Sequence, residues 1–137
     1  MFEASQFTPT KWDSAEDKAR FANQFAKFVS GSFRREDFPK WFYNSLHLTF
    51  GHIAHYDQYG FFATFFECQA GKVQFLAQCL EYPAYGDPDH TYCDVEKALK
   101  IWLRDGRYLE RAKADLASQV EVAERVQLAR LKDKYEA

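Results

Sequence analysis

Three histidines lie close together in the middle of the chain, and histidine is the side chain best suited to metal binding and proton transfer near neutral pH. They are His47, His52 and His55, and Asp57 follows them. On a helix, His52 and His55 would lie three residues apart on one face, a spacing that can ligate one metal ion. His47 lies too far round for an easy third ligand. A complete metal site would therefore need ligands from elsewhere, such as Asp89, His90 or a cysteine.

The competing interpretation treats these histidines as hydrogen-bonded, partly buried aromatic side chains, and the sequence favours it. An acid–base pair of His55 and Asp57 is disfavoured because residues two apart on a helix do not face each other. The sequence also lacks the serine-hydrolase, zinc-protease, phosphate-loop and dinucleotide motifs. We therefore expect no cofactor, and a small His-dependent metal-binding hydrolase using His52 and His55 is an alternative function.

A second group of candidate residues lies in the segment 82–93, which contains two prolines, one glycine and three tyrosines and is predicted to be a loop. Tyrosines on a proline-stiffened loop offer amphipathic contact area at low entropic cost, which is typical of binding hot spots. The alternative is a plain surface connector with Tyr85 or Tyr92 folded back on the core. The candidate partner-binding residues of this loop are Tyr82, Tyr85, Asp87, Asp89, His90 and Tyr92.

The first third of the chain has a local positive bias, and within it Arg34 and Arg35 follow Phe33. This arginine pair is a candidate contact for a phosphate or an acidic partner. The alternative is an ordinary solvated face, to which Lys18 and Lys27 would also belong. Across the whole chain, 18 basic and 20 acidic residues give a net charge of −2, so sequence-specific nucleic-acid binding is not expected.

Helical periodicity dominates the elements that must position these residues. Asp13 or Ser14 begins a helix over 14–30, and Gly31 is expected to end it with a positive φ. A second helix is predicted to start near Phe38 and to continue through Gly51 to residue 56. Further helices are predicted from about residue 71 to the residues before Pro83, and from Asp94 or Thr91 to the break at 105–106.

The segment 52–66 is the ambiguous part of the chain. Residues 61–66 form a six-residue apolar run without a decisive period, which suits a buried helix or a buried strand. The favoured fold is therefore all-α: one domain over 1–137, built as a compact bundle of five to six helices. The alternative is α+β, with one short hairpin at 52–66.

The last predicted helix, over 107–137, contains no proline or glycine after Gly106. At 1.5 Å per residue it would be about 45 Å long, whereas a domain of this size is about 30 Å across. Part of the helix is thus expected to project or to pack on another chain. A homodimer formed through this helix is a further alternative, although Gln119 and Gln127 interrupt any heptad.

Composition places the protein in an ordinary globular class. Of its 25 aromatic residues, 18 precede Glu67, so the first half is expected to build the core. The three cysteines, Cys68, Cys79 and Cys93, fit reduced thiols better than a disulfide framework. No export signal and no membrane span are recognisable, and we expect a soluble, cytoplasmic protein.

The segments 50–66 (FGHIAHYDQYGFFATFF) and 85–88 (YGDP) resemble small bacterial proteins encoded on phages and plasmids. The resemblance extends from Lys18 to about Trp102. It implies accessory cargo of mobile elements, a pool that includes anti-CRISPR and other anti-defence proteins that act mostly by binding host machinery. The expected function is a non-enzymatic protein-binding module, a mobile-element inhibitor of a host CRISPR-type defence complex.

Overall fold

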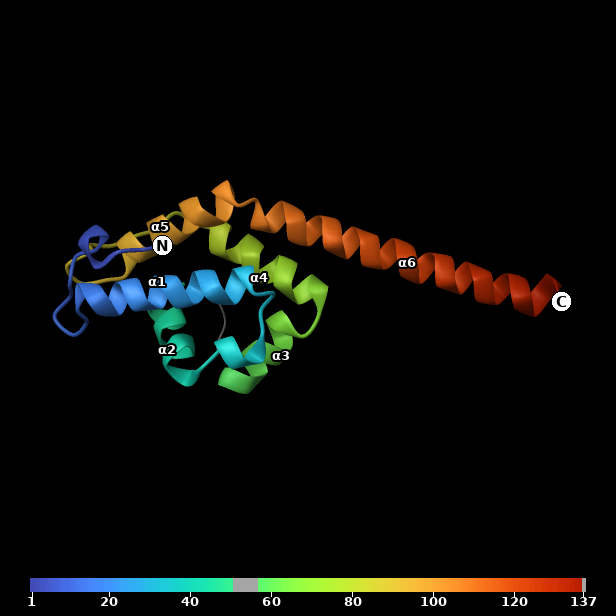
Figure 1. The fold of residues 1–137 in the computed structure, drawn as a ribbon, viewed down its shortest axis with the longest axis horizontal. Helices are drawn as coiled ribbons and strands as arrows, with labels where there is room; N and C mark the ends of the chain where they lie inside the picture. The colour runs from blue at the N-terminus through green and yellow to red at the C-terminus, as the bar shows by residue number, and fades with distance from the viewer. Residues whose placement is uncertain (51–56, 137) are drawn as a thin grey trace.

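The computed structural model describes residues 1–50 and 57–136, and within these residues it contains helices and no strand (Figure 1). The all-α prediction is confirmed. Two short 3-10 helices, η1 (Ala4–Gln6) and η2 (Arg35–Asp37), accompany six α-helices. The α-helices are α1 (Ala15–Ser30), α2 (Lys40–Thr49), α3 (Gln58–Phe66), α4 (Gln69–Glu81), α5 (Cys93–Asp105) and α6 (Tyr108–Glu136).

Helix α1 begins where the sequence predicts. Ser14 is its N-cap: the Ser14 hydroxyl accepts a hydrogen bond from Asp17 N, and the Asp17 carboxylate accepts one from Ser14 N. This reciprocal capping satisfies two backbone donors of the first turn. Gly31 ends the helix as its C-cap, as predicted, but its φ is −88° and not positive. The left-handed turn after α1 is made instead by Ser32 and Phe33, with φ of 66° and 58°.

Aromatic rings fill the centre of the bundle, as the uneven distribution of these residues predicts. Phe25 of α1 is fully buried, and its ring lies 5.6 Å from that of Phe50 and 6.2 Å from that of Phe75. Phe28, one turn further along, has its ring centroid 4.8 Å from Phe66 of α3 in an edge-to-face contact. Such offset and edge-on pairs add to the stabilisation that burial alone provides.

Helices α3 and α4 approach each other closely at Gly71. A Cβ atom added there would lie 2.5 Å from the carbonyl oxygen of Thr64 and 2.8 Å from that of Phe65. The absence of a side chain therefore allows the start of α4 to contact the backbone at the end of α3.

Two expectations about the middle of the chain are wrong. The second helix does not continue through Gly51, because α2 ends at Thr49 with Phe50 as its C-cap. The hairpin alternative also fails, since the apolar run 61–66 is part of helix α3. Asp57 begins that helix by accepting a hydrogen bond from Gly60 N, at 2.7 Å. Residues 51–56 lie outside the described part of the chain.

Helix α6 leaves the bundle and projects well beyond it (Figure 1). Its first turns pack on α4 and α5, with Ala112 buried. From residue 117 to residue 135 every side chain is exposed. The predicted long, projecting helix is confirmed. None of the described helices combines the length and apolar content required of a membrane span.

Candidate binding surface at the tyrosine loop

The predicted loop is present at residues 82–92, between α4 and α5, and a buried lysine holds one side of it. Lys18 of α1 is 0 % exposed. Its ammonium group donates hydrogen bonds to the carbonyl oxygens of Pro88 and Thr91, both at 2.9 Å, and to the carboxylate of Asp94 at 2.9 Å. A buried ammonium group whose three donors are all used in this way fixes the loop to the N-terminal half of α1.

A second buried lysine holds the opposite end of the loop. Lys100 of α5 is 4 % exposed, donates a hydrogen bond to the carbonyl oxygen of Tyr82, and forms an ion pair with Glu96 at 2.8 Å. Inside the loop, Asp87 O accepts hydrogen bonds from the backbone amides of His90 and Thr91. The loop is thus tied to two helices and to itself, so its surface is ordered before any partner binds.

Four large apolar side chains are exposed on and around this loop. They are Tyr82 (50 % exposed), Tyr85 (77 %), Leu48 (58 %) and Trp12 (77 %). Together they rim two adjoining hollows. One, of about 360 Å³, is lined by Leu48, Tyr82, Pro83 and Tyr85, and the other, of about 210 Å³, by Trp12, Leu48, His90 and Tyr92. Leu48 and Thr91 line both, and we call this region the tyrosine-loop surface.

The tyrosine-loop surface has an acidic rim. Between residues 82 and 93 the chain contains Asp87 and Asp89 but no lysine or arginine. Both aspartates are exposed, and Asp13 lines the second hollow. One lysine lies at the edge of the surface, since the Lys11 ammonium group is 5.5 Å from the centre of the Trp12 ring. The arrangement combines apolar hollows with negative charge, which favours a partner that presents apolar and basic side chains.

The structure separates the predicted loop residues into two groups. Tyr82, Tyr85, Asp87, Asp89 and His90 are exposed, whereas Tyr92 is 4 % exposed and its ring packs edge-on against Phe21 at 6.1 Å. Burial, and then the neighbouring Asp13, raise the pKa of the Tyr92 phenol above its ordinary value. Tyr92 is therefore part of the core beneath the loop and is not exposed to a partner.

The arginine pair does not belong to the tyrosine-loop surface. Arg34 and Arg35 follow the C-terminal end of α1, whereas Lys18 contacts the loop near the opposite end of that helix. Arg34 forms an ion pair with Asp37 at 3.1 Å, and Arg35 forms one with Glu67 at 3.5 Å. Carboxylates of the same chain thus already occupy both guanidinium groups.

The histidine candidates do not form a site within the described residues. His47 is half-buried, with its ring 4.6 Å from Tyr43 and 6.1 Å from Phe61, which agrees with the aromatic interpretation for this residue. Asp57 caps α3. His52 and His55 lie outside the described residues, and among the residues that are described no three histidine, cysteine or acidic side chains could share a metal ion.

All three cysteines are free thiols, as predicted. Cys79 and Cys93 are buried, and burial raises the pKa of the Cys79 thiol well above its ordinary value, which keeps it protonated. Cys68 is exposed and acts as the N-cap of α4, since its sulfur accepts a hydrogen bond from Gly71 N at 3.4 Å.

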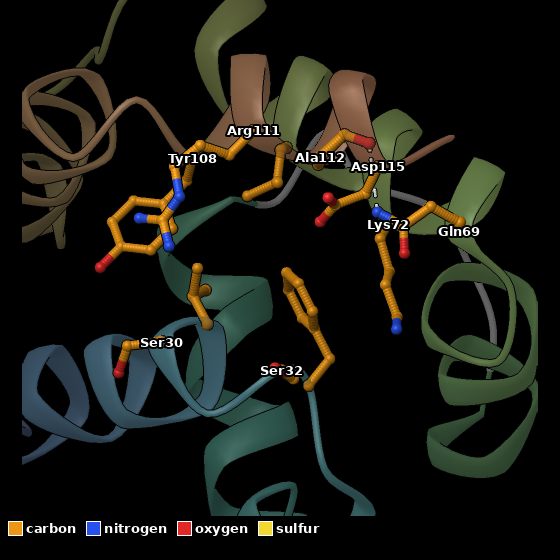
Figure 2. A pocket seen from close by; sticks show the side chains of 11 residues that line it. Ser30, Ser32, Gln69, Lys72, Tyr108, Arg111, Ala112 and Asp115 are labelled. Carbon is orange, nitrogen blue, oxygen red and sulfur yellow. Dashed lines mark hydrogen bonds between the residues drawn. The ribbon is translucent and has the colours of Figure 1, made fainter. Parts of the chain in front are cut away.

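A separate hollow of about 130 Å³ lies where α6 leaves the bundle, between the end of α1, helix α4 and the first turns of α6 (Figure 2). Lys72 and Arg111 lie on opposite sides of it in this view, and the Asp115 carboxylate lies between them. Gln69 crosses its rim by donating a hydrogen bond to the carbonyl oxygen of Ala112, at 3.2 Å. The Asp115 carboxylate offsets one of the two positive charges that line this hollow.

Sequence reasoning missed two residues of the tyrosine-loop surface, and it also missed the buried lysine that anchors the loop, which was expected on a solvated face. Trp12 and Leu48 come from segments distant from the loop in sequence, and no local pattern connects them to it. Lys18 did leave a signal. Phe21, Ala22 and Phe25 follow it at intervals of three, four and seven residues, which places Lys18 on the buried face of α1. A lysine on an apolar face indicates an internal partner.

No protein-family model, curated protein or solved structure matches the chain. The resemblance to mobile-element accessory proteins therefore stays a prediction.

Proposed function

We propose that the protein is a non-enzymatic protein-binding module and that it binds its partner at the tyrosine-loop surface. The observation that supports this most strongly is the group of four exposed apolar side chains around two adjoining hollows. Exposed apolar patches rimmed by polar residues are typical of interaction sites. Tyrosine and tryptophan are also the residues most enriched at binding hot spots.

The fixed conformation of the loop favours the same proposal. Ordering a mobile loop on binding costs free energy, and Lys18 and Lys100 already hold this loop through its backbone carbonyl groups. A surface connector without a binding role has no need of two buried ammonium groups, each of which is costly to desolvate.

The partner is a protein surface that presents apolar and basic side chains. The hollows accept the apolar groups, and Asp87 and Asp89 attract the basic ones. The narrower function, inhibition of a host CRISPR-type defence complex by a mobile-element protein, is part of the proposal and rests on the sequence resemblance alone. The proteins of such a complex that bind nucleic acid carry basic surfaces, which match the acidic rim of the tyrosine-loop surface.

The test is an affinity purification from bacterial lysate with the tagged protein and a matched pair of variants. Tyr82→Ala/Tyr85→Ala removes two rings from the tyrosine-loop surface. Tyr59→Ala/Ile101→Ala removes two apolar side chains that are 70 % and 58 % exposed elsewhere on the bundle. We expect the wild type and the second variant to retain one stoichiometric partner, identified by mass spectrometry, and the first variant to lose it at least tenfold. A partner retained equally by both variants, or no stoichiometric partner, would contradict the proposal.

A further inference from the structure

The second half of α6 projects from the bundle with its side chains uncovered. At 1.5 Å per residue the stretch 117–135 is about 28 Å long, and every side chain in it is exposed. It lies at the opposite end of the molecule from the N-terminal end of α1, where the tyrosine loop is anchored (Figure 1). What it binds is thus independent of the function proposed above.

The apolar side chains of this stretch are unusual for a helix that stays in water. Large apolar residues between 41 % and 73 % exposed are Val120, Val122, Val126, Leu128, Leu131 and Tyr135. Three of them are valines, whose β-branched side chains lower helix propensity. A solitary helix is stabilised by alanine and by charged residues with long side chains, so these valines and leucines indicate burial against a partner.

The face that packs on the bundle also continues along the free half. Leu109 and Ala112 face the core, Leu116 is half-buried, and Val120, Ala123 and Leu131 continue the same line. The intervals of three and four residues keep this line straight along the helix, with Gln127 as its one polar member. The uncovered stripe is thus an extension of an existing packing face.

The charges of α6 are unevenly distributed along the helix, with an acidic first part and a basic second part. Residues 113–124 contain Lys113, Asp115, Glu121 and Glu124, a net charge of −2, whereas residues 125–136 have a net charge of +2. The second segment contains Arg125, Arg130, Lys132, Asp133, Lys134 and Glu136. The helix dipole acts only within the first and last turns, so it does not account for charge separated over whole halves.

We propose that the free half of α6 pairs with the same helix of a second copy of this chain, in antiparallel orientation. That orientation places the acidic half of each helix opposite the basic half of the other, whereas a parallel pair would bring like charges together. It also gives a closed two-fold dimer. The two bundles then lie at opposite ends of the helix pair and do not collide, since α6 extends away from its own bundle (Figure 1).

The test measures the molar mass of the full-length protein by light scattering during gel filtration, at low salt and over a range of concentrations. The acidic half is reversed in Glu121→Lys/Glu124→Lys, and the complete swap adds Arg130→Glu/Lys132→Glu. We expect a dimer for the wild type, a monomer or at least tenfold weaker association for the first variant, and a dimer again for the complete swap. A control variant, Glu81→Lys/Glu110→Lys, makes the same charge change outside the free half and should remain dimeric.

Each alternative outcome overturns the antiparallel pair. A wild type that is monomeric at every concentration removes the partner, and a dimer that the acidic-half variant leaves intact shows that other residues hold it. A complete swap that stays monomeric shows that the orientation is wrong. Circular dichroism of each variant checks that α6 stays helical, because Glu121→Lys also removes the ion pair between Glu121 and Arg125.

Discussion

The most consequential single residue outside the aromatic core is Lys18. Its apolar stem continues the buried face of α1, while its ammonium group reaches the loop carbonyl groups and Asp94. One side chain thus connects the first helix of the bundle to the surface proposed to bind the partner. It does so because three acceptors surround it, so the cost of desolvating the charge is offset by hydrogen bonds.

Replacement of Lys18 by methionine should be strongly destabilising. The variant keeps most of the apolar stem but leaves the carbonyl groups of Pro88 and Thr91 without the ammonium donor. The Asp94 carboxylate loses its counter-charge and keeps only the backbone donors Thr8 N and Val95 N. Removal of one partner from a buried ion pair costs about 3 kcal/mol or more. Urea denaturation followed by circular dichroism measures the loss, and adding Asp94→Asn should recover part of it by removing the unpaired charge.

The exposed Lys40→Met is the control, and its unfolding free energy is expected within about 0.5 kcal/mol of wild type. Equal stability of the two methionine variants would show that the Lys18 contacts contribute nothing.

Among the elements, the contact between α3 and α4 is the one most sensitive to a small change. Alanine favours a helix over glycine by about 1 kcal/mol, so Gly71→Ala would be stabilising if the helix alone mattered. Here the new Cβ would meet the backbone of Thr64 at 2.5 Å, an atom that cannot rotate away. We expect the clash to dominate and unfolding free energy to fall by about 1–3 kcal/mol, as for other overpacked sites. Thermal and urea denaturation check this against Gln74→Ala, a change at an exposed position of the same helix. A Gly71→Ala variant at least as stable as wild type would mean that α4 shifts without cost.

The helices themselves were largely predictable, because their signals are local. Ser14 and Gly31 bound α1, and the 3-4 spacing of apolar residues identifies its buried face. The end of α2 was not predictable in the same way, since Phe50 is an apolar residue that continues the helical pattern and is buried as a C-cap. The tyrosine-loop surface was only half predictable: Tyr82 and Tyr85 are local features of the loop, whereas Trp12 and Leu48 reach it through the tertiary fold.

At the scale of the whole molecule, the two proposed interaction surfaces are at opposite ends, and α6 makes the molecule long (Figure 1). The length of this helix was predictable from an uninterrupted sequence and from the size of the domain that precedes it. The sequence alone does not show whether the valines of this helix are buried. The structure shows that they are exposed in the described part of the chain, and this exposure indicates a partner.

Truncation after Ala117 separates the role of the free half of α6 from that of its base. The side chains removed up to residue 135 are all exposed, so the truncated chain should fold with the same unfolding free energy as the full-length monomer. The two proteins should differ in how stability depends on concentration. If the free halves pair, association favours the folded state by mass action, and the melting temperature of the full chain rises with protein concentration. The melting temperature of the truncated chain should stay constant, and differential scanning calorimetry over a hundredfold concentration range distinguishes the two proteins.

A truncated chain less stable than the full chain even at the lowest concentration would mean that the free half stabilises its own bundle. The exposed apolar stripe would then need an intramolecular explanation.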